Sequence, residues 1–109
     1  MKTMDINRVI LKGKIIGELS SVKVNDTSVV NFVLSTTRTY TKKNGERMSD
    51  VTYHDMEAWD TVGEGLVARA DEGSIIFVEG HQKLNIWEKD GQKRSKIKVV
   101  VDLFDVLEV

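Results

Sequence analysis

The chain has 109 residues, no cysteine and a net charge of -1, with an isoelectric point near 6.1. Its length predicts one domain covering residues 1–109, and the lack of cysteine excludes a disulfide framework and a thiolate metal site. No apolar run approaches the roughly 18 residues of a membrane span and the N-terminus lacks a signal-peptide core, so we expect a soluble cytoplasmic protein with no membrane partner.

The first predicted strand covers residues 6–16. Its side chains alternate as in a strand with one buried face, with Val9, Leu11 and Ile15 on one side and Arg8, Lys12 and Lys14 mostly on the other. Gly13 interrupts this pattern, and a glycine inside a strand often marks a bulge or a sharp bend. We therefore expect a bend at Gly13, a continuation over residues 17–24, and a turn at Asn25 and Asp26.

Residues 29–59 predict a long hairpin whose two alternating strands flank a polar, basic turn at residues 42–47. Successive side chains of a strand point to opposite faces. In the second strand, Tyr53 and Trp59 therefore share one face, and His54 and Met56 share the other. One of these faces is expected to pack against the protein core, and the other is a candidate surface for stacking bases.

The segment from Asp60 to Glu72 is the one convincing helical segment. Four apolar residues fall on one face at helical spacing, namely Val62, Leu66, Val67 and Ala70. Asp60 or Thr61 is expected to cap its start, and Gly73 to end it. This helix would plug one end of a barrel, with Leu66 and Val67 entering the core.

Residues 74–80 read as a buried strand, followed by a hairpin formed by residues 82–88, a turn at 89–92 and a returning strand. Lys83 and Trp87 share a face of the outgoing strand. In the returning strand, one side carries Ile97, Val99, Val101 and Leu103, and the other carries Arg94, Lys96 and Lys98. The sequence thus predicts an all-β fold with one short helix: a five-stranded barrel with the helix between strands three and four. This is the plan of the OB-fold, which binds oligonucleotides or oligosaccharides.

The near-neutral total charge conceals a segmented distribution. Residues 38–49 carry a net charge of +3 and residues 80–98 carry +4, whereas residues 50–79 carry -7. Two basic patches on an otherwise acidic chain indicate possible contacts with a polyanion, although such patches also occur as solvated surface.

The order and spacing of several segments resemble the bacterial and phage single-stranded DNA-binding protein family over nearly the whole chain, from Asn7 to about Val106. The opening Asn7, Val9, Leu11, Gly13 resembles that family's N-x-V-x-L-x-G start. Residues 32–40, 52–59 and 73–80 resemble its second, third and fourth strands, and Trp87 with Asp90 and Gly91 resembles its aromatic-bearing hairpin. The resemblance implies base stacking on Tyr40, Tyr53, Trp59 and Trp87, and a homo-oligomer, most often a tetramer, with a dimer as the alternative.

Single-strand binders combine a basic groove for phosphates with aromatic platforms for bases, as this family does. The nucleic-acid-binding residues predicted on this basis are Arg38, Tyr40, Lys42, Lys43, Arg47, Tyr53, Trp59, Lys83, Trp87, Arg94, Lys96 and Lys98. The three phenylalanines, by contrast, lie among aliphatic residues and are expected in the core: Phe32, Phe77 and Phe104.

Two features depart from the family pattern. Asp55 and Glu57 share a face with Tyr53 and Trp59, where carboxylates should weaken phosphate binding. They would either turn to solvent or pair with Arg38 or Arg47. The chain also ends at LFDVLEV, without the acidic tail tip through which bacterial members recruit other proteins, so we expect no tail-mediated recruitment.

Catalysis and metal binding have little support. The two histidines, His54 and His81, lie far apart in sequence, and His54 is better explained as a structural residue at the core or a subunit surface. Asp55, Glu57 and Asp60 lack a general base at fixed spacing. We therefore expect no enzyme activity, no metal and no cofactor.

The function predicted from the sequence is sequence-tolerant binding of single-stranded DNA, which coats and protects strands during replication, recombination and repair. The expected setting is the nucleoid of a bacterial cell or of a phage-infected host. One alternative is an OB-fold replication accessory or RNA-binding module. Another is a protein-interaction barrel that never contacts nucleic acid.

Overall fold

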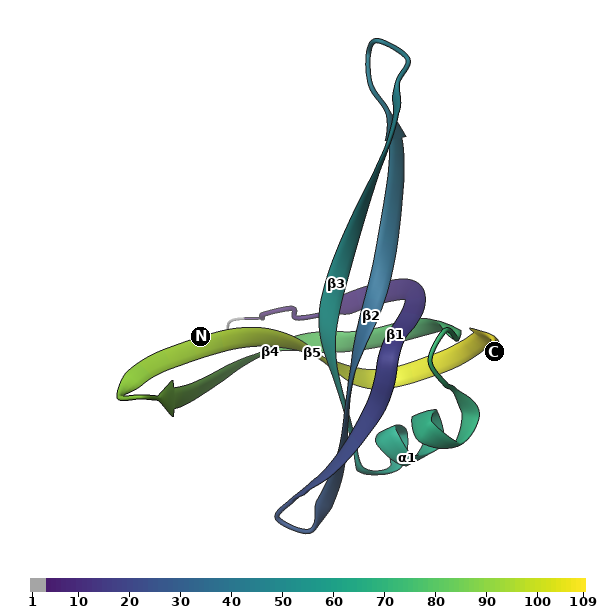
Figure 1. The fold of residues 1–109 in the computed structure, drawn as a ribbon. Coiled ribbons are helices and arrows are strands. Elements are labelled where there is room, and N and C mark those ends of the chain that lie inside the picture. Colours follow the sequence, from purple (N-terminus) through teal and green to yellow (C-terminus); the bar gives the residue numbers. More distant parts are fainter. Residues whose placement is uncertain (1–3) are drawn as a thin grey trace.

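The computed structural model describes residues 4–109, so the first three residues of the predicted domain lie outside the described part. Within it the chain forms five strands, with one helix between the third and the fourth, as predicted. The elements are β1 (Val9–Val24), β2 (Thr27–Thr41), β3 (Arg47–Trp59), α1 (Asp60–Arg69), β4 (Ile75–Lys89) and β5 (Gln92–Glu108) (Figure 1).

The five strands close into a barrel in the order β1, β2, β3, β5, β4. Neighbouring strands pair antiparallel except β3 and β5, which run parallel and meet through Met56 with Val99 and Glu57 with Val100. β1 changes partner along its length, because residues 9–14 pair with β4 and residues 14–24 pair mainly with β2. This arrangement confirms the predicted five-stranded barrel with the plan of an OB-fold.

The core fills the barrel where the strands cross. Ile15 of β1 and Leu34 of β2 are fully buried, and Val9 and Leu11 pack against the same cluster, which confirms the predicted inner face of β1. α1 packs on β2, β3 and β5 and inserts Leu66, which is also fully buried. Full burial of each such aliphatic side chain contributes about 1.5–3 kcal/mol to folding.

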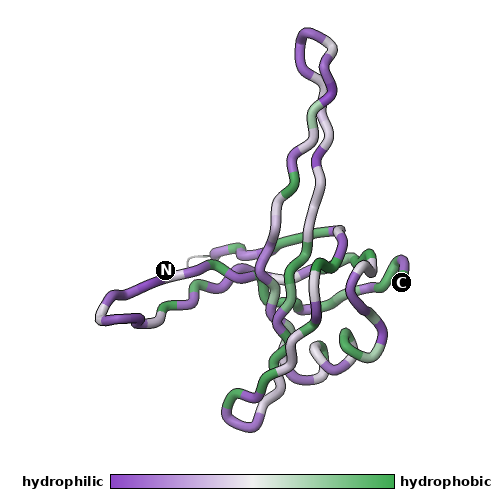
Figure 2. The backbone as a smooth tube through the Cα atoms, viewed as in Figure 1, coloured by the Kyte–Doolittle hydropathy of each residue, from purple (hydrophilic) through white to green (hydrophobic). Residues whose placement is uncertain are grey.

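The β2–β3 and β4–β5 hairpins extend beyond the barrel (Figure 1). The β4–β5 hairpin ends in the two-residue turn Asp90–Gly91, whose φ angles of 54° and 76° suit the normal twist of paired strands. The β2–β3 hairpin ends in a loop at residues 42–46, closed by the Lys42 N–H donating to the Glu46 carbonyl at 2.8 Å. This loop is hydrophilic (Figure 2). Both predicted hairpins are confirmed.

The predicted bend at Gly13 is misplaced. The pairing of β1 with β4 runs without interruption through Gly13, whereas the pairing with β2 slips between Ile16 and Ser20, where Gly17 has a φ of 76°. Gly13 is required for a different reason: a Cβ there would lie 2.2 Å from the Ser35 carbonyl oxygen. The glycine permits the close approach of β2 at the point where β1 changes partner.

The predicted helix is too long and is capped differently. α1 ends at Arg69, with Ala70 at the C-cap, and its N-cap position is Trp59, which makes no side-chain capping bond. Gly73, with a φ of 89°, follows the helix and donates its N–H to the Ile15 carbonyl. Val67 is exposed, contrary to the prediction, because Leu66 and Gly63 occupy the buried side of the helix.

The predicted core face of β5 is only half right. Val99 and Val101 are buried, but Ile97 is exposed because it precedes the contact of β5 with β3 at Val99 and pairs with Leu84 of β4 alone. A register slip pairs Gly80 with Val101 and Glu79 with Leu103, which leaves Asp102 as an extra residue. Inward and outward positions exchange there, so Leu103 is exposed.

Two of the three phenylalanines lie in or against the core, as predicted. Phe104, on the inward side after the slip, packs against the core, and Phe32 is buried within it. Phe77 is half-buried on the face of β4 opposite to Ile76 and Val78, so its assignment to the core is wrong.

Candidate nucleic-acid interface

The twelve predicted binding residues fall into two groups. The first occupies the projecting part of the β2–β3 hairpin and consists of Arg38, Tyr40, Lys42, Lys43 and Arg47. The second lies on one face of the barrel and of the β4–β5 hairpin, and consists of Tyr53, Trp59, Lys83, Trp87, Arg94, Lys96 and Lys98. We call this second surface the β3–β4–β5 face; it also contains Asp55, Glu57 and Asn85.

The hairpin group combines exposed cations with one aromatic ring. The Arg38 guanidinium carbon lies 5.1 Å from the centroid of the Tyr40 ring, a cation–π distance. The register of the hairpin pairs Tyr40 with Met48 and Ser35 with Tyr53, so strand alternation places Tyr40 and Tyr53 on opposite faces of the hairpin. A ligand that contacts both tyrosines must therefore pass around the hairpin edge.

Cross-strand pairing builds the basic part of the β3–β4–β5 face. In the β4–β5 ladder Lys83 pairs with Lys98, Asn85 with Lys96, and Trp87 with Arg94. Partners that are directly opposite share a face, so these residues form two adjacent rows of three. Lys83 and Trp87, predicted to share a face of β4, therefore also share it with the basic side of β5.

Three aromatic side chains on this face differ in accessibility. Tyr53 is 65% exposed and Trp87 is 42% exposed, and Trp87 lines an open recess of about 380 Å³ with Arg94 and Lys96. Trp59 is half-buried, and the Lys83 ammonium lies 5.1 Å from its ring centroid. Tyr53 and Trp87 thus offer free ring surface, whereas Lys83 covers part of Trp59.

Glu57 is the least accessible charged residue of this face, with 5% exposure. Its Oε1 accepts a 2.8 Å hydrogen bond from Trp59 Nε1–H and lies 3.6 Å from Lys83 Nζ. Its Oε2 accepts from Asn85 at 3.5 Å and lies 3.7 Å from Lys98 Nζ. One carboxylate therefore connects side chains of β3, β4 and β5.

These contacts keep Glu57 ionised. Burial by itself would raise its pKa, but the hydrogen bond from Trp59, the charge of Lys83, the hydrogen bond from Asn85 and the charge of Lys98 together hold the pKa below its ordinary value. A neutral Glu57 would lose much of this favourable interaction, so the face contains a permanent negative charge at neutral pH.

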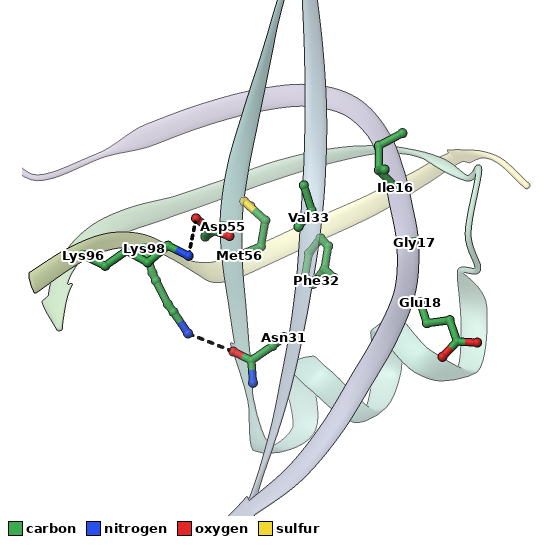
Figure 3. A pocket seen from close by; sticks show the side chains of 10 residues that line it. All are labelled: Ile16, Gly17, Glu18, Asn31, Phe32, Val33, Asp55, Met56, Lys96 and Lys98. Atoms are coloured by element: carbon green, nitrogen blue, oxygen red, sulfur yellow. Dashed lines mark hydrogen bonds and ion pairs between the residues drawn. The ribbon is translucent and has the colours of Figure 1, made fainter. Parts of the chain in front are cut away.

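Asp55 forms a second ion pair with the basic row. Its Oδ2 lies 2.9 Å from Lys96 Nζ, at the side of a recess of about 320 Å³ (Figure 3). In the same view Lys98 Nζ donates to Asn31 Oδ1 at 3.3 Å. The predicted alternatives for Asp55 and Glu57, solvent or pairing with Arg38 or Arg47, are therefore wrong. The parallel contact between β3 and β5 brings Lys96 and Lys98 beside them instead.

The sequence did not identify Asn31 and Asn85 as part of this site, nor Glu57 as its centre. The alternation of β3 already placed Glu57 beside Trp59, two residues apart on one face. Nothing local in the sequence, however, connects Glu57 with Lys83 or Lys98, which lie 26 and 41 positions further along the chain.

The two histidines have separate partners. His54 Nε2 lies 2.9 Å from Thr36 Oγ1 in the β2–β3 hairpin, and His81 Nδ1 lies 3.0 Å from Asp102 Oδ2. Among residues 4–109 there is no cluster of three or more histidine, aspartate or glutamate side chains suited to a metal ion. Nor does this part of the chain contain a helix with the length and apolar character to cross a membrane.

Comparison with known proteins gives a consistent result. The model of the "Single-strand binding protein family" matches residues 6–107. The "Single-stranded DNA-binding protein" of Aquifex aeolicus is 30% identical over 98 residues, which cover 89% of this chain and 67% of that protein. "Single-stranded DNA-binding protein 2" of Streptococcus agalactiae serotype III is 31% identical over 103 residues, covering 94% and 77%.

Solved structures show the same architecture. A deletion mutant of the single-stranded DNA binding protein from Thermus aquaticus superposes with a TM-score of 0.82 at 26% identity, covering 94% of this chain and 51% of that one. The Plasmodium falciparum SSB complex with ssDNA superposes with a TM-score of 0.81, covering 100% and 99%. At 18% identity this second likeness concerns the fold alone.

Proposed function

The chain belongs to the single-strand binding protein family, and from this premise we propose that it coats single-stranded DNA without sequence preference. The observation that carries the proposal is the β3–β4–β5 face, where exposed Trp87 lies directly opposite Arg94 at the end of the two rows that contain Lys83, Lys96 and Lys98. Bases would stack on Trp87, Tyr53 and Trp59, and phosphates would contact the cations between them.

We assign the phosphate contacts of a bound strand to both groups of cations. On the β3–β4–β5 face Arg94 is the basic residue without a carboxylate partner among the described ion pairs, whereas Lys83, Lys96 and Lys98 are paired with Asp55 or Glu57. The hairpin cations Lys42, Lys43 and Arg47 likewise have no ion pair in residues 4–109. Arg38, whose guanidinium lies over the Tyr40 ring, also has no ion pair in this part of the chain. These five residues therefore provide the strongest free attraction for a polyanion.

Binding is the whole activity that we propose. The role would be to protect single strands during replication, recombination and repair in the cytoplasm, with no catalytic step and no cofactor. We also propose that residues 1–109 act as one domain. This chain spans about half the length of the Thermus aquaticus chain it resembles, so partners that act through other segments are not part of the proposal.

We further propose that the protein self-associates, as a tetramer or a dimer. Residues 9–13 of β1 pair with β4 on one side, while pairing with β2 begins at Lys14, which leaves one edge of this segment open. Ile10, on the outward side of the segment, is 56% exposed. An open strand edge with adjacent apolar surface favours pairing with another copy, so the start of β1 is the preferred contact and His54 a second one.

Titration with fluorescent oligo-dT, oligo-U and duplex DNA at two salt concentrations tests the proposal. We expect oligo-dT to bind far more tightly than duplex, with an affinity that falls as salt increases. Preference for oligo-U would favour an RNA-binding module. No binding to any of the three would leave a protein-interaction barrel and overturn the proposed function.

A further inference from the structure

We infer that Glu57 is a positioning residue of the single-strand interface, which fixes the Trp59 indole by its N–H edge and holds Lys83 over the indole face. The inference rests on the proposed function and adds to it a role for a carboxylate that simple charge matching would exclude. Glu57 itself need not contact DNA, because its effect is exerted through Trp59, Lys83 and Lys98.

The geometry separates Glu57 from an ordinary surface acid. Both of its oxygens are used, Oε1 by Trp59 and Lys83 and Oε2 by Asn85 and Lys98. At 5% exposure the carboxylate is screened from water, which makes these contacts stronger than those of exposed pairs. An indole has only one polar hydrogen, so a short bond to a fixed acceptor defines the position of the ring edge.

Lys83 completes the arrangement. Its ammonium lies 3.6 Å from Glu57 Oε1 and 5.1 Å from the Trp59 ring centroid, so the same lysine contacts both the acceptor and the ring. A base that stacks on this face of Trp59 must displace Lys83, which can then follow the phosphate. We therefore expect Lys83 to exchange the indole face for the bound strand while Glu57 keeps the indole edge in place.

The negative charge of Glu57 and its positioning of Trp59 have opposite effects on the affinity for single-stranded DNA. The two effects can therefore be tested separately. Glu57 lowers the attraction for phosphates by one charge, but it pre-orders a stacking residue, which reduces the ordering cost of binding. Glu57→Gln removes the charge and keeps an oxygen that can accept from Trp59, while the Asn85 amide can rotate to accept from the new amide. Glu57→Ala removes both contributions.

Asp55 provides a matched control. It lies two residues earlier on the same face of β3 and pairs with Lys96 at 2.9 Å, but it makes no contact with Trp59. Asp55→Ala and Asp55→Asn therefore remove one carboxylate from the same face without affecting the indole. An effect that substitutions at Asp55 and Glu57 share is caused by the loss of a negative charge. An effect seen only with substitutions at Glu57 is caused by the loss of Trp59 positioning.

The first measurement uses free protein in a Trp87→Phe background, where Trp59 gives the single indole N–H signal in an NMR spectrum. We expect Glu57→Gln to move this signal upfield, since a carboxylate acceptor is replaced by a weaker neutral one, and Glu57→Ala to speed its exchange with water. The Asp55 variants should leave the signal unchanged. If Glu57→Gln does not shift the indole N–H signal, the inference is wrong. This test needs only the Glu57→Gln protein to fold, so it remains decisive even if Glu57→Ala does not fold.

The second measurement is oligo-dT affinity at low salt, in the background that retains Trp87. Glu57→Gln and Asp55→Asn should bind as tightly as the parent or more tightly. Glu57→Ala should bind at least about fivefold more weakly than Glu57→Gln, the smallest effect expected if one stacked base is lost. Equal affinities for Glu57→Ala and Asp55→Ala would contradict the inference. Because the NMR test contains no DNA, its result is independent of whether the proposed function holds.

Discussion

Lys83 and Lys98 lie directly opposite each other on β4 and β5, and their Nζ atoms lie 3.6 and 3.7 Å from the two carboxylate oxygens of Glu57. Like charges in opposite positions of an antiparallel pair destabilise a sheet. The counter-ion comes from a third strand, β3, so the basic row and the aromatic strand of the interface depend on each other. This relationship makes the stability of the face sensitive to the ionisation of one residue.

The first prediction concerns pH. The pKa of Glu57 is lower in the folded protein than its ordinary value of 4.5, so the folded state binds fewer protons than the unfolded state around that pH. The stability that Glu57 contributes is therefore fully present above about pH 5 and is lost as the pH falls through the lowered pKa. The parent should melt at a higher temperature than Glu57→Gln at neutral pH, and the gap should narrow as the pH falls below 4.5 through the lowered pKa of Glu57. A gap of constant size over this range would contradict the prediction.

The second prediction concerns salt. Replacing both Lys42 and Lys43 by Gln should reduce oligo-dT affinity and make the log–log salt slope shallower by about 0.7 for each phosphate contact that is lost. Lys23→Gln is the control, because Lys23 lies at the end of β1 near the turn to β2, far from the hairpin tip in Figure 1. Equal slopes for the double variant and the parent would remove the hairpin tip from the interface.

Local patterns predicted most of the fold because each strand has one buried face. The alternation along β1 placed Ile15 in the core, and the two-residue turn Asp90–Gly91 was recognisable from its composition. Two of the errors arise at register slips. The single extra residue Asp102 exchanges inward and outward positions and exposes Leu103. The slip after Ile16 adds two residues to β1, which keeps the alternation but places the bend beyond Gly13.

The composition of the site was predictable, but the pairing within it was not. Strand periodicity alone placed Lys83 with Trp87 on one face of β4, and Arg94 with the neighbouring lysines on one face of β5. That these two faces coincide follows from the cross-strand register. The partners of Asp55 and Glu57 depend on β3 and β5 running side by side, a contact between segments about 40 residues apart. Periodicity carries no information on such long-range neighbours, so the carboxylates were assigned to arginines that are nearer in sequence.

The third prediction concerns self-association. Ile10→Asp should shift the protein toward the 12.3 kDa monomer in light scattering at micromolar concentration, because it places a charge on the exposed apolar part of β1. Val67→Asp introduces the same change at an exposed position of α1 and should leave the assembly intact. A parent protein that is already monomeric would contradict the proposed oligomer, and equal effects of the two variants would place the contact elsewhere.

The last prediction separates the two tryptophans. Trp87 is 42% exposed on a hairpin beyond the barrel, so Trp87→Ala should leave the melting temperature nearly unchanged. It should weaken oligo-dT binding by about 1–3 kcal/mol, the range for one stacked base in single-strand binders as a class, this family included. Quenching of the intrinsic fluorescence by oligo-dT should decrease but persist, because Trp59 remains.

Trp59→Ala should behave differently, because it removes the hydrogen-bond donor of Glu57 as well as ring packing. Trp59 is half-buried, so we expect a loss of unfolding free energy below the ~3–5 kcal/mol typical of fully buried tryptophans, accompanied by weaker binding. Melting temperature and oligo-dT affinity, measured for both variants, decide each residue separately. Full affinity and undiminished quenching in Trp87→Ala would remove Trp87 from the interface, and normal affinity of the folded Trp59→Ala protein would make Trp59 a purely structural residue.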